Sequence, residues 1–161
     1  MKTQSIYVVM ALGVLVMGAG CAKTEDAGPP QIRFGQDTCK ACGMIIEDER
    51  YAAAVVTIGP SGVVEKYSFD DIGEMLEFSP PQGAHQVRRY VRDVATRHWI
   101  DAGRATLVKL PEVQTPMGSG IVAYEDAQAA GTAAAARGGE LITPVSATRA
   151  PDETSTGEYL K

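Results

Sequence analysis

The fold is indicated most clearly by the stretch YAAAVVTIGPSGVVEKYSFDDIGEML, which spans residues 51–76. Residues 51–58 become rich in valine toward their end, and β-branched side chains favour strands. Residues 59–62 (GPSG) have the composition of a turn. Residues 63–69 then form the return strand, so the sequence predicts a β-hairpin.

A helix is expected to follow this hairpin directly. Asp70 and Asp71 place negative charge where the N-terminal end of a helix dipole favours it. Ile72, Met75 and Leu76 then recur at helical spacing and predict one buried face. A third strand is expected at residues 87–93, which completes a ββαβ unit.

The second part of the chain repeats this order of elements. A strand is expected at residues 105–110 and another at 121–124, with a loop between them. An alanine-rich helix follows from Glu125 to about Arg137, ending at two glycines that favour termination. The last strand is expected at residues 140–143.

The two units match at the junction of strand and helix. Residues 68–71 (SFDD) and 123–126 (AYED) each contain a strand end, an aromatic residue, two acids and a helix start. We therefore expect an α+β fold of two similar ββαβ halves, with three strands in each sheet. The first half, with the segment that precedes it, is expected at residues 37–96 and the second at 97–143.

Both ends of the chain are expected to lie outside this fold. Residues 1–20 combine a lysine, an apolar run too short to cross a bilayer and small residues before Cys21. This pattern predicts a lipoprotein signal peptide with lipidation of Cys21; the alternative is an ordinary secretory signal cleaved near Gly20. Residues 21–36 are expected to be a polar tether and residues 144–161 a flexible tail.

The stretch DTCKACGM, residues 37–44, holds the candidate site. Cys39 and Cys42 are spaced so that both thiolates can turn toward one centre, and Gly43 lets the backbone bend so that the Met44 sulfur lies beside them. Thiolate and thioether sulfurs are soft ligands that select cuprous copper. The spacing thus predicts a copper(I) site with Cys39, Cys42 and Met44 as ligands.

Three other interpretations of the cysteine pair remain open: a thiol–disulfide redox motif, half of a zinc site and a local disulfide. A redox motif of the thioredoxin kind follows a buried strand, whereas a turn precedes this pair. A structural zinc site needs four ligands, and Cys21 is expected to carry lipid. In an oxidising periplasm the two thiols would be either bonded to each other or protected by a metal.

Two further residues are weighed as ligands. Met117 lies in a proline–glycine loop and is either a third soft ligand or a packing residue between the halves. His98, beside Trp99, is either a structural residue at the junction of the halves or a ligand, since imidazole suits copper.

Composition and charge exclude several classes of function. The net charge of −5 does not favour a nucleic-acid partner. No catalytic triad, phosphate-binding glycine loop or catalytic carboxylate pair is evident in the sequence. We therefore expect a binding protein and not an enzyme.

The ordered motifs of the whole chain resemble the NosL family, the accessory proteins of nitrous-oxide reductase. The resemblance rests on the lipoprotein-like start and the cysteine–glycine–methionine site. It rests also on WIDA at 99–102, TPMG at 115–118 and GGEL at 138–141. The family's metal motif, C-x-M, falls on Cys42 and Met44, while Cys39 is an additional thiol found in some members.

The resemblance implies a copper(I) chaperone anchored by lipid on the periplasmic side of a bacterial membrane, with the outer membrane expected. It implies delivery of copper for the copper–sulfur centre of nitrous-oxide reductase, together with a dedicated membrane ABC transporter, and two ββαβ halves. The alternative function is a periplasmic thiol–disulfide oxidoreductase or thiol reductant that uses Cys39 and Cys42.

Overall fold

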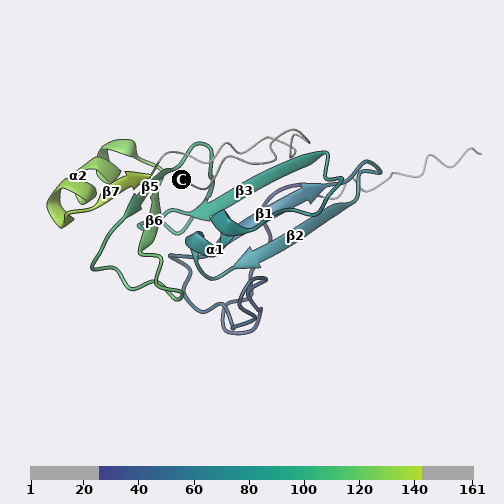
Figure 1. Ribbon diagram of the computed structural model, residues 1–161, viewed down its shortest axis with the longest axis horizontal. Helices are drawn as coiled ribbons and strands as arrows, with labels where there is room; N and C mark the ends of the chain where they lie inside the picture. Colours follow the sequence, from purple (N-terminus) through teal and green to yellow (C-terminus); the bar gives the residue numbers. More distant parts are fainter. Residues whose placement is uncertain (1–25, 143–161) are drawn as a thin grey trace, which may run out of the picture.

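The computed structural model describes residues 26–142. Two sheets lie along the long axis of the molecule, with β1, β2 and β3 toward one end and α2 beside β5 and β7 at the other (Figure 1). Helix α1 lies between the two sheets. In chain order the elements are β1 (Ala53–Ile58), β2 (Val64–Phe69), α1 (Ile72–Glu77), β3 (Gln86–Arg92), β4 (Trp99–Asp101), β5 (Thr106–Lys109), β6 (Ile121–Tyr124), α2 (Ala127–Arg137) and β7 (Glu140–Ile142).

The predicted hairpin of β1 and β2 forms one side of the first sheet, with β2 at the edge. Strand β1 pairs antiparallel with β2 on one side and with β3 on the other, and the full strand order is β2-β1-β3-β4. The turn at residues 59–62 closes through backbone bonds from Gly62 to Gly59 and from Gly59 to Val63. Gly62 has a φ of +80°, a conformation that glycine adopts without steric cost.

The second sheet has the order β6-β5-β7, with both pairings antiparallel. In each half the first strand is central, the second strand and the helix follow, and the third strand pairs on the other edge of the first. The prediction of an α+β fold with two similar ββαβ halves is therefore confirmed.

Strand β4 departs from the prediction of three strands in each sheet, which is wrong for the first sheet. Trp99–Asp101 pairs antiparallel with the end of β3 as a fourth strand. The turn before it is held by the buried carboxylate of Asp93, which accepts bonds from the backbone N–H groups of Ala95 and Thr96. Three residues are too few to show the period-two pattern of a strand, so this element had no signature in the sequence.

The core depends on alternation along the strands of the second sheet. Leu107 of β5 packs into the core shared with the first sheet, whereas the next residue, Val108, packs on the opposite face beneath α2. Helix α2 buries Ala130 and Ala134, which lie one turn apart on one face. The second sheet is thus covered on both faces, by the first half and by α2.

Buried carboxylates connect the halves. Asp71 is the N-cap of α1 and accepts a bond from Gly73 N at 2.7 Å. The same side chain accepts bonds from Thr115 Oγ1 at 2.6 Å and from Met117 N at 3.0 Å, both in the β5–β6 loop of the second half. Asp93 of the first half likewise accepts a bond from Glu125 N at 2.9 Å.

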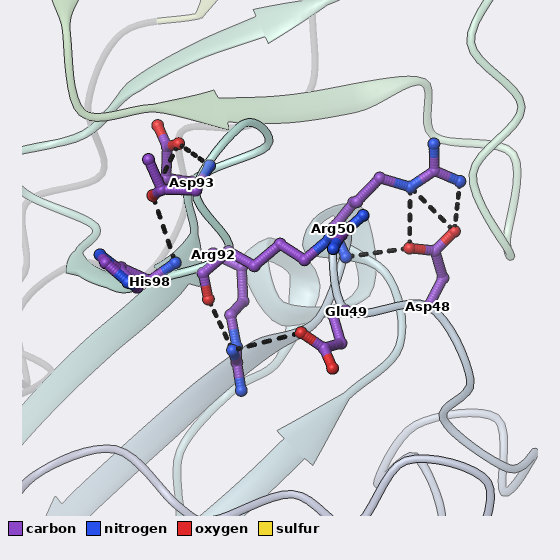
Figure 2. A network of polar contacts seen from close by, with 8 residues as sticks. Asp48, Glu49, Arg50, Arg92, Asp93 and His98 are labelled. Carbon is purple, nitrogen blue, oxygen red and sulfur yellow. Dashed lines mark hydrogen bonds and ion pairs between the residues drawn. The ribbon is translucent and has the colours of Figure 1, made fainter.

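A polar network holds the segment after the candidate site against β3 and its following turn (Figure 2). The guanidinium of Arg92 stacks between the rings of Phe34 and Trp99, donates to the carbonyl of Arg97 and lies 3.9 Å from the Glu49 carboxylate. The approach of Glu49 to Arg92 places the segment at residues 47–50 beside the first sheet.

Part of the expected tether belongs to the folded body. Ile32 is buried in the core and the hydroxyl of Tyr90 donates to the carbonyl of Ala27. From residue 26 onward, the expected tether of residues 21–36 is therefore not a free spacer. The apolar side chain of Ile32, within this polar stretch, packs into the core. The expected signal peptide, Cys21 and the tail at 144–161 lie outside the described residues. Neither helix within residues 26–142 has the length and hydrophobicity needed to cross a membrane.

The bond network of Asp71 predicts a large effect on stability. We expect Asp71→Ala to lower the free energy of unfolding by about 3 kcal/mol, because it removes a buried charge and leaves buried donors unpaired. Asp126→Ala removes the equivalent N-cap of α2, which is exposed and bonds only Gln128 N, and should cost about 1 kcal/mol. Urea unfolding of both variants followed by circular dichroism makes the measurement.

The pH dependence should change with the same substitution. Burial opposes ionisation of Asp71, but bonds from Ser119, Thr115 and the backbone N–H groups of Gly73 and Met117 outweigh it and hold the pKa below its usual value. The resulting stability is present above the unfolded-state pKa of about 3.9 and is lost as the pH falls below it. Asp71→Ala should therefore flatten the fall in stability between about pH 4.5 and 2; an unchanged slope would contradict this assignment.

Candidate metal centre

The two cysteines lie on a short hairpin loop before β1. Thr38 and Ile45 form an isolated antiparallel bridge, and Cys39 N donates to Met44 O at 2.7 Å. Gly43 N donates back to Cys39 O, and Gly43 has a φ of +76°, which favours glycine at this position. The loop thus turns tightly enough to place Met44 directly across from Cys39.

Each thiol faces a carboxylate. Cys39 Sγ donates to Glu74 Oε2 at 2.9 Å, and Cys42 Sγ lies 3.7 Å from Asp70 Oδ1. One ligand atom from each of these four residues lies within 4.8 Å of the other three. Both cysteines are free thiols in the structure, so the spacing brings two sulfurs to one centre without bonding them to each other.

The fold of the first half positions the carboxylates. Asp70 follows the end of β2 and Glu74 is in the first turn of α1, four residues later. Asp70 precedes the N-cap Asp71, so both carboxylates lie at the N-terminal end of α1, where they contact the two thiols. Lys40 N donates to Ser68 O at 2.8 Å and ties the loop to the same end of β2.

The surroundings of Cys39 favour its protonated thiol. Burial, and after it the bond to the Glu74 carboxylate, raise the pKa of Cys39 to about 12. Burial also raises the pKa of Glu74, as does the neighbouring Asp70. Because metals bind thiolates, occupation of this centre must displace a proton from Cys39.

The other expected ligands, Met44, Met117 and His98, have exposed side chains in different places. Met44 is 48% exposed and lines an open hollow together with Asp70 and Pro116. Met117, next to that proline, is 45% exposed, and its backbone is fixed by Asp71. His98 is exposed on the turn after β3, where its carbonyl accepts a bond from Asp93 N (Figure 2). The four-residue group described above contains no histidine.

Sequence reasoning missed Asp70 and Glu74 as members of the site. The two acids at 70–71 were assigned only to the helix dipole. They carry separate tasks: Asp71 caps the helix and joins the halves, while Asp70 faces Cys42. A sequence signal for this division does not exist, because the carboxylates lie 28 and 35 residues from the thiols they contact.

The group as a whole is suited to hold a metal ion on the surface of a rigid half. It combines two sulfurs with two carboxylates on a loop fixed by backbone bonds, and Met44 lies beside it at the rim. These features define an α+β protein with two ββαβ halves and, on the first of them, a group of two thiols and two carboxylates that could hold a metal ion.

The chain belongs to the NosL family. The family model matches residues 32–148, which is more than half of the chain. Among solved structures, the chain is similar to the copper chaperone NosL from Shewanella denitrificans, with 23% sequence identity and a TM-score of 0.59. The likeness covers 73% of this chain and 92% of that one; at this identity it establishes the fold. Comparison with curated proteins gave no match.

The unequal environments of the two thiols predict unequal reactivity. We expect iodoacetamide at pH 8 to alkylate Cys42 at least about tenfold faster than Cys39, because Cys39 is buried and only its thiolate reacts. Glu74→Gln should speed the alkylation of Cys39, because it removes the negative charge of the carboxylate that favours the protonated thiol. Peptide mapping by mass spectrometry resolves the sites, and equal rates for both cysteines would contradict the described packing.

Proposed function

We propose that this protein is an exported copper(I) chaperone in which Cys39, Cys42 and Met44 bind the ion as cargo. The observation that carries the proposal is the convergence of two free thiols on one loop, with an exposed thioether across the turn from Cys39. Membership of the NosL family supports it, and the structurally similar Shewanella denitrificans protein is itself described as a copper chaperone.

The choice of copper(I) follows from the sulfur ligands. Soft thiolate and thioether ligands select the cuprous ion over hard cations, for which oxygen ligands are preferred. A bound cuprous ion would also protect the thiols from oxidation outside the cytoplasm. Met44 is a neutral ligand at the rim, so it weakens one bond and gives an acceptor a place to enter.

The recipient is proposed from family membership. We expect the copper to serve assembly of the copper–sulfur centre of nitrous-oxide reductase, with a membrane ABC transporter as a further partner. The protein would act on the periplasmic side of the membrane as a binding protein without catalytic activity of its own.

The environment of Cys39 disfavours the alternative of a thiol–disulfide oxidoreductase. Such enzymes lower the pKa of the attacking cysteine, often at a helix N-terminus. Here burial and Glu74 raise the pKa of Cys39, and the cysteines precede a strand. A dithiol-exchange assay with the reduced protein should therefore show slow turnover.

Copper affinity should fall in a graded order among loop variants. Cys42→Ser should nearly abolish cuprous binding, Cys39→Ser should weaken it less, and Met44→Leu should weaken it while conserving volume and apolar character. Anaerobic titration in competition with a chromogenic cuprous chelator measures each affinity.

Glu74→Gln provides the matched control at the same centre. It removes a hard oxygen ligand and leaves all sulfurs in place, so cuprous affinity should not fall. Circular dichroism confirms that each variant is folded. Wild-type affinity in Cys42→Ser would show that the central assignment is wrong.

Membrane attachment depends on Cys21, which follows residues 18–20 (GAG) after the apolar run. We propose lipidation at this cysteine and expect Cys21→Ala either to release the protein into the soluble periplasmic fraction or to block its processing. Intact-mass measurement of the mature wild-type protein decides between this and simple secretion; an unlipidated chain beginning at Ala22 would contradict lipidation.

A further inference from the structure

Two open hollows flank the cysteine loop, and their linings differ in charge. One, of about 380 Å³, is lined by Cys39 and includes Lys40 and Lys66. Its one carboxylate, Asp37, is bonded to Arg33. The other, of about 610 Å³, has three carboxylates and no basic side chain in its lining, which consists of Gly43, Met44, Ile45, Glu47, Asp48, Asp70 and Pro116.

The second hollow also gathers exposed apolar side chains. Met44 and Ile45 line it, and each has nearly half of its surface exposed. Met117, similarly exposed, follows the lining residue Pro116 in the chain but is not itself part of the lining. Apolar surface concentrated beside charged residues is typical of protein–protein contact sites. None of the large exposed apolar side chains described for residues 26–142 lines the lysine-containing hollow.

Both walls of the acidic hollow are held in place by the fold. The Pro116 wall is fixed because Met117 N bonds the buried Asp71 carboxylate. The opposite wall continues into residues 47–50, where Asp48 pairs with Arg50 and Glu49 lies near Arg92 (Figure 2). Glu47 is exposed and has no ion-pair partner among the described residues, so its charge is available to an incoming molecule.

We propose that this hollow, between the Met44 loop and the Pro116 loop, is the docking face for the protein that receives the metal, and that the receiving surface is positively charged around an apolar contact. The proposal rests on the proposed chaperone function. Opposite charge at the rim accelerates and orients encounter, while the apolar centre supplies contact area. A partner seated here meets the exposed thioether first and leaves Cys39 as the last ligand to be released.

The test uses the copper-loaded full chain and two defined probes: copper-free nitrous-oxide reductase and the purified ABC transporter of the maturation system. Surface plasmon resonance gives the association rate constant at low and high ionic strength. Glu47→Lys reverses charge at the acidic hollow, and Lys66→Glu is the matched control at the other hollow. Both side chains are exposed and neither is a proposed ligand.

With at least one probe, Glu47→Lys should slow association at least about tenfold at low ionic strength, and the difference should shrink at high ionic strength because rim charges act through screened steering. Ile45→Ser should speed dissociation. Lys66→Glu should leave both rates within about twofold, as for a charge outside the contact. Cuprous affinity by chelator competition should be unchanged in all three variants.

The proposal is overturned if Lys66→Glu slows association and Glu47→Lys does not, or if the wild-type chain binds neither probe. Failure of the chaperone function itself has a different signature, which is loss of cuprous binding by the wild-type chain in the chelator assay. The two failures are therefore read from separate measurements.

Discussion

The carboxylate of Asp71 is the contact on which the arrangement of the two halves depends. It caps α1 within the first half and accepts bonds from Thr115 and Met117 of the second. A buried carboxylate is stable only when its oxygens are hydrogen-bonded. The geometry that satisfies Asp71 therefore fixes where the β5–β6 loop lies, and with it one wall of the hollow beside the metal centre.

Asp70, the residue before Asp71, contacts the candidate site, so the site lies directly beside the contact that joins the halves. Asp70 ends β2 and faces Cys42, while Asp71 faces the second half. Of two adjacent side chains at the start of α1, one thus contacts the candidate site and the other joins the halves. The equivalent position of the second half keeps the cap, Asp126. Among the described residues, the group of potential metal ligands lies in the first half alone.

Many features were predictable because they depend on local order in the chain. The hairpin of β1 and β2, the helix start at Asp71, the glycine end of α2 at Gly138 and the repetition of ββαβ all follow from patterns within ten or so residues. The dithiol loop was recognisable for the same reason. Strand β4 was not, because three residues show no periodicity and its existence depends on the free edge of β3. The burial of Ile32 could not be predicted either, because a single apolar residue in a polar stretch forms no periodic pattern.

The sequence by itself therefore determined the order and type of every element except β4, the resemblance to a family and the sulfur atoms offered by one loop. The tertiary structure decided what surrounds those sulfurs. Glu74 and Asp70 reach the thiols only because β2 and α1 fold back over the loop, and the burial that results raises the pKa of Cys39. Likewise, the bond from the Met117 backbone to Asp71 helps to hold the loop that places Pro116 beside Asp70 and Met44. Contacts between residues far apart in the chain are set by packing and by the hydrogen bonding of buried polar groups. Local sequence patterns do not predict which residues meet in this way.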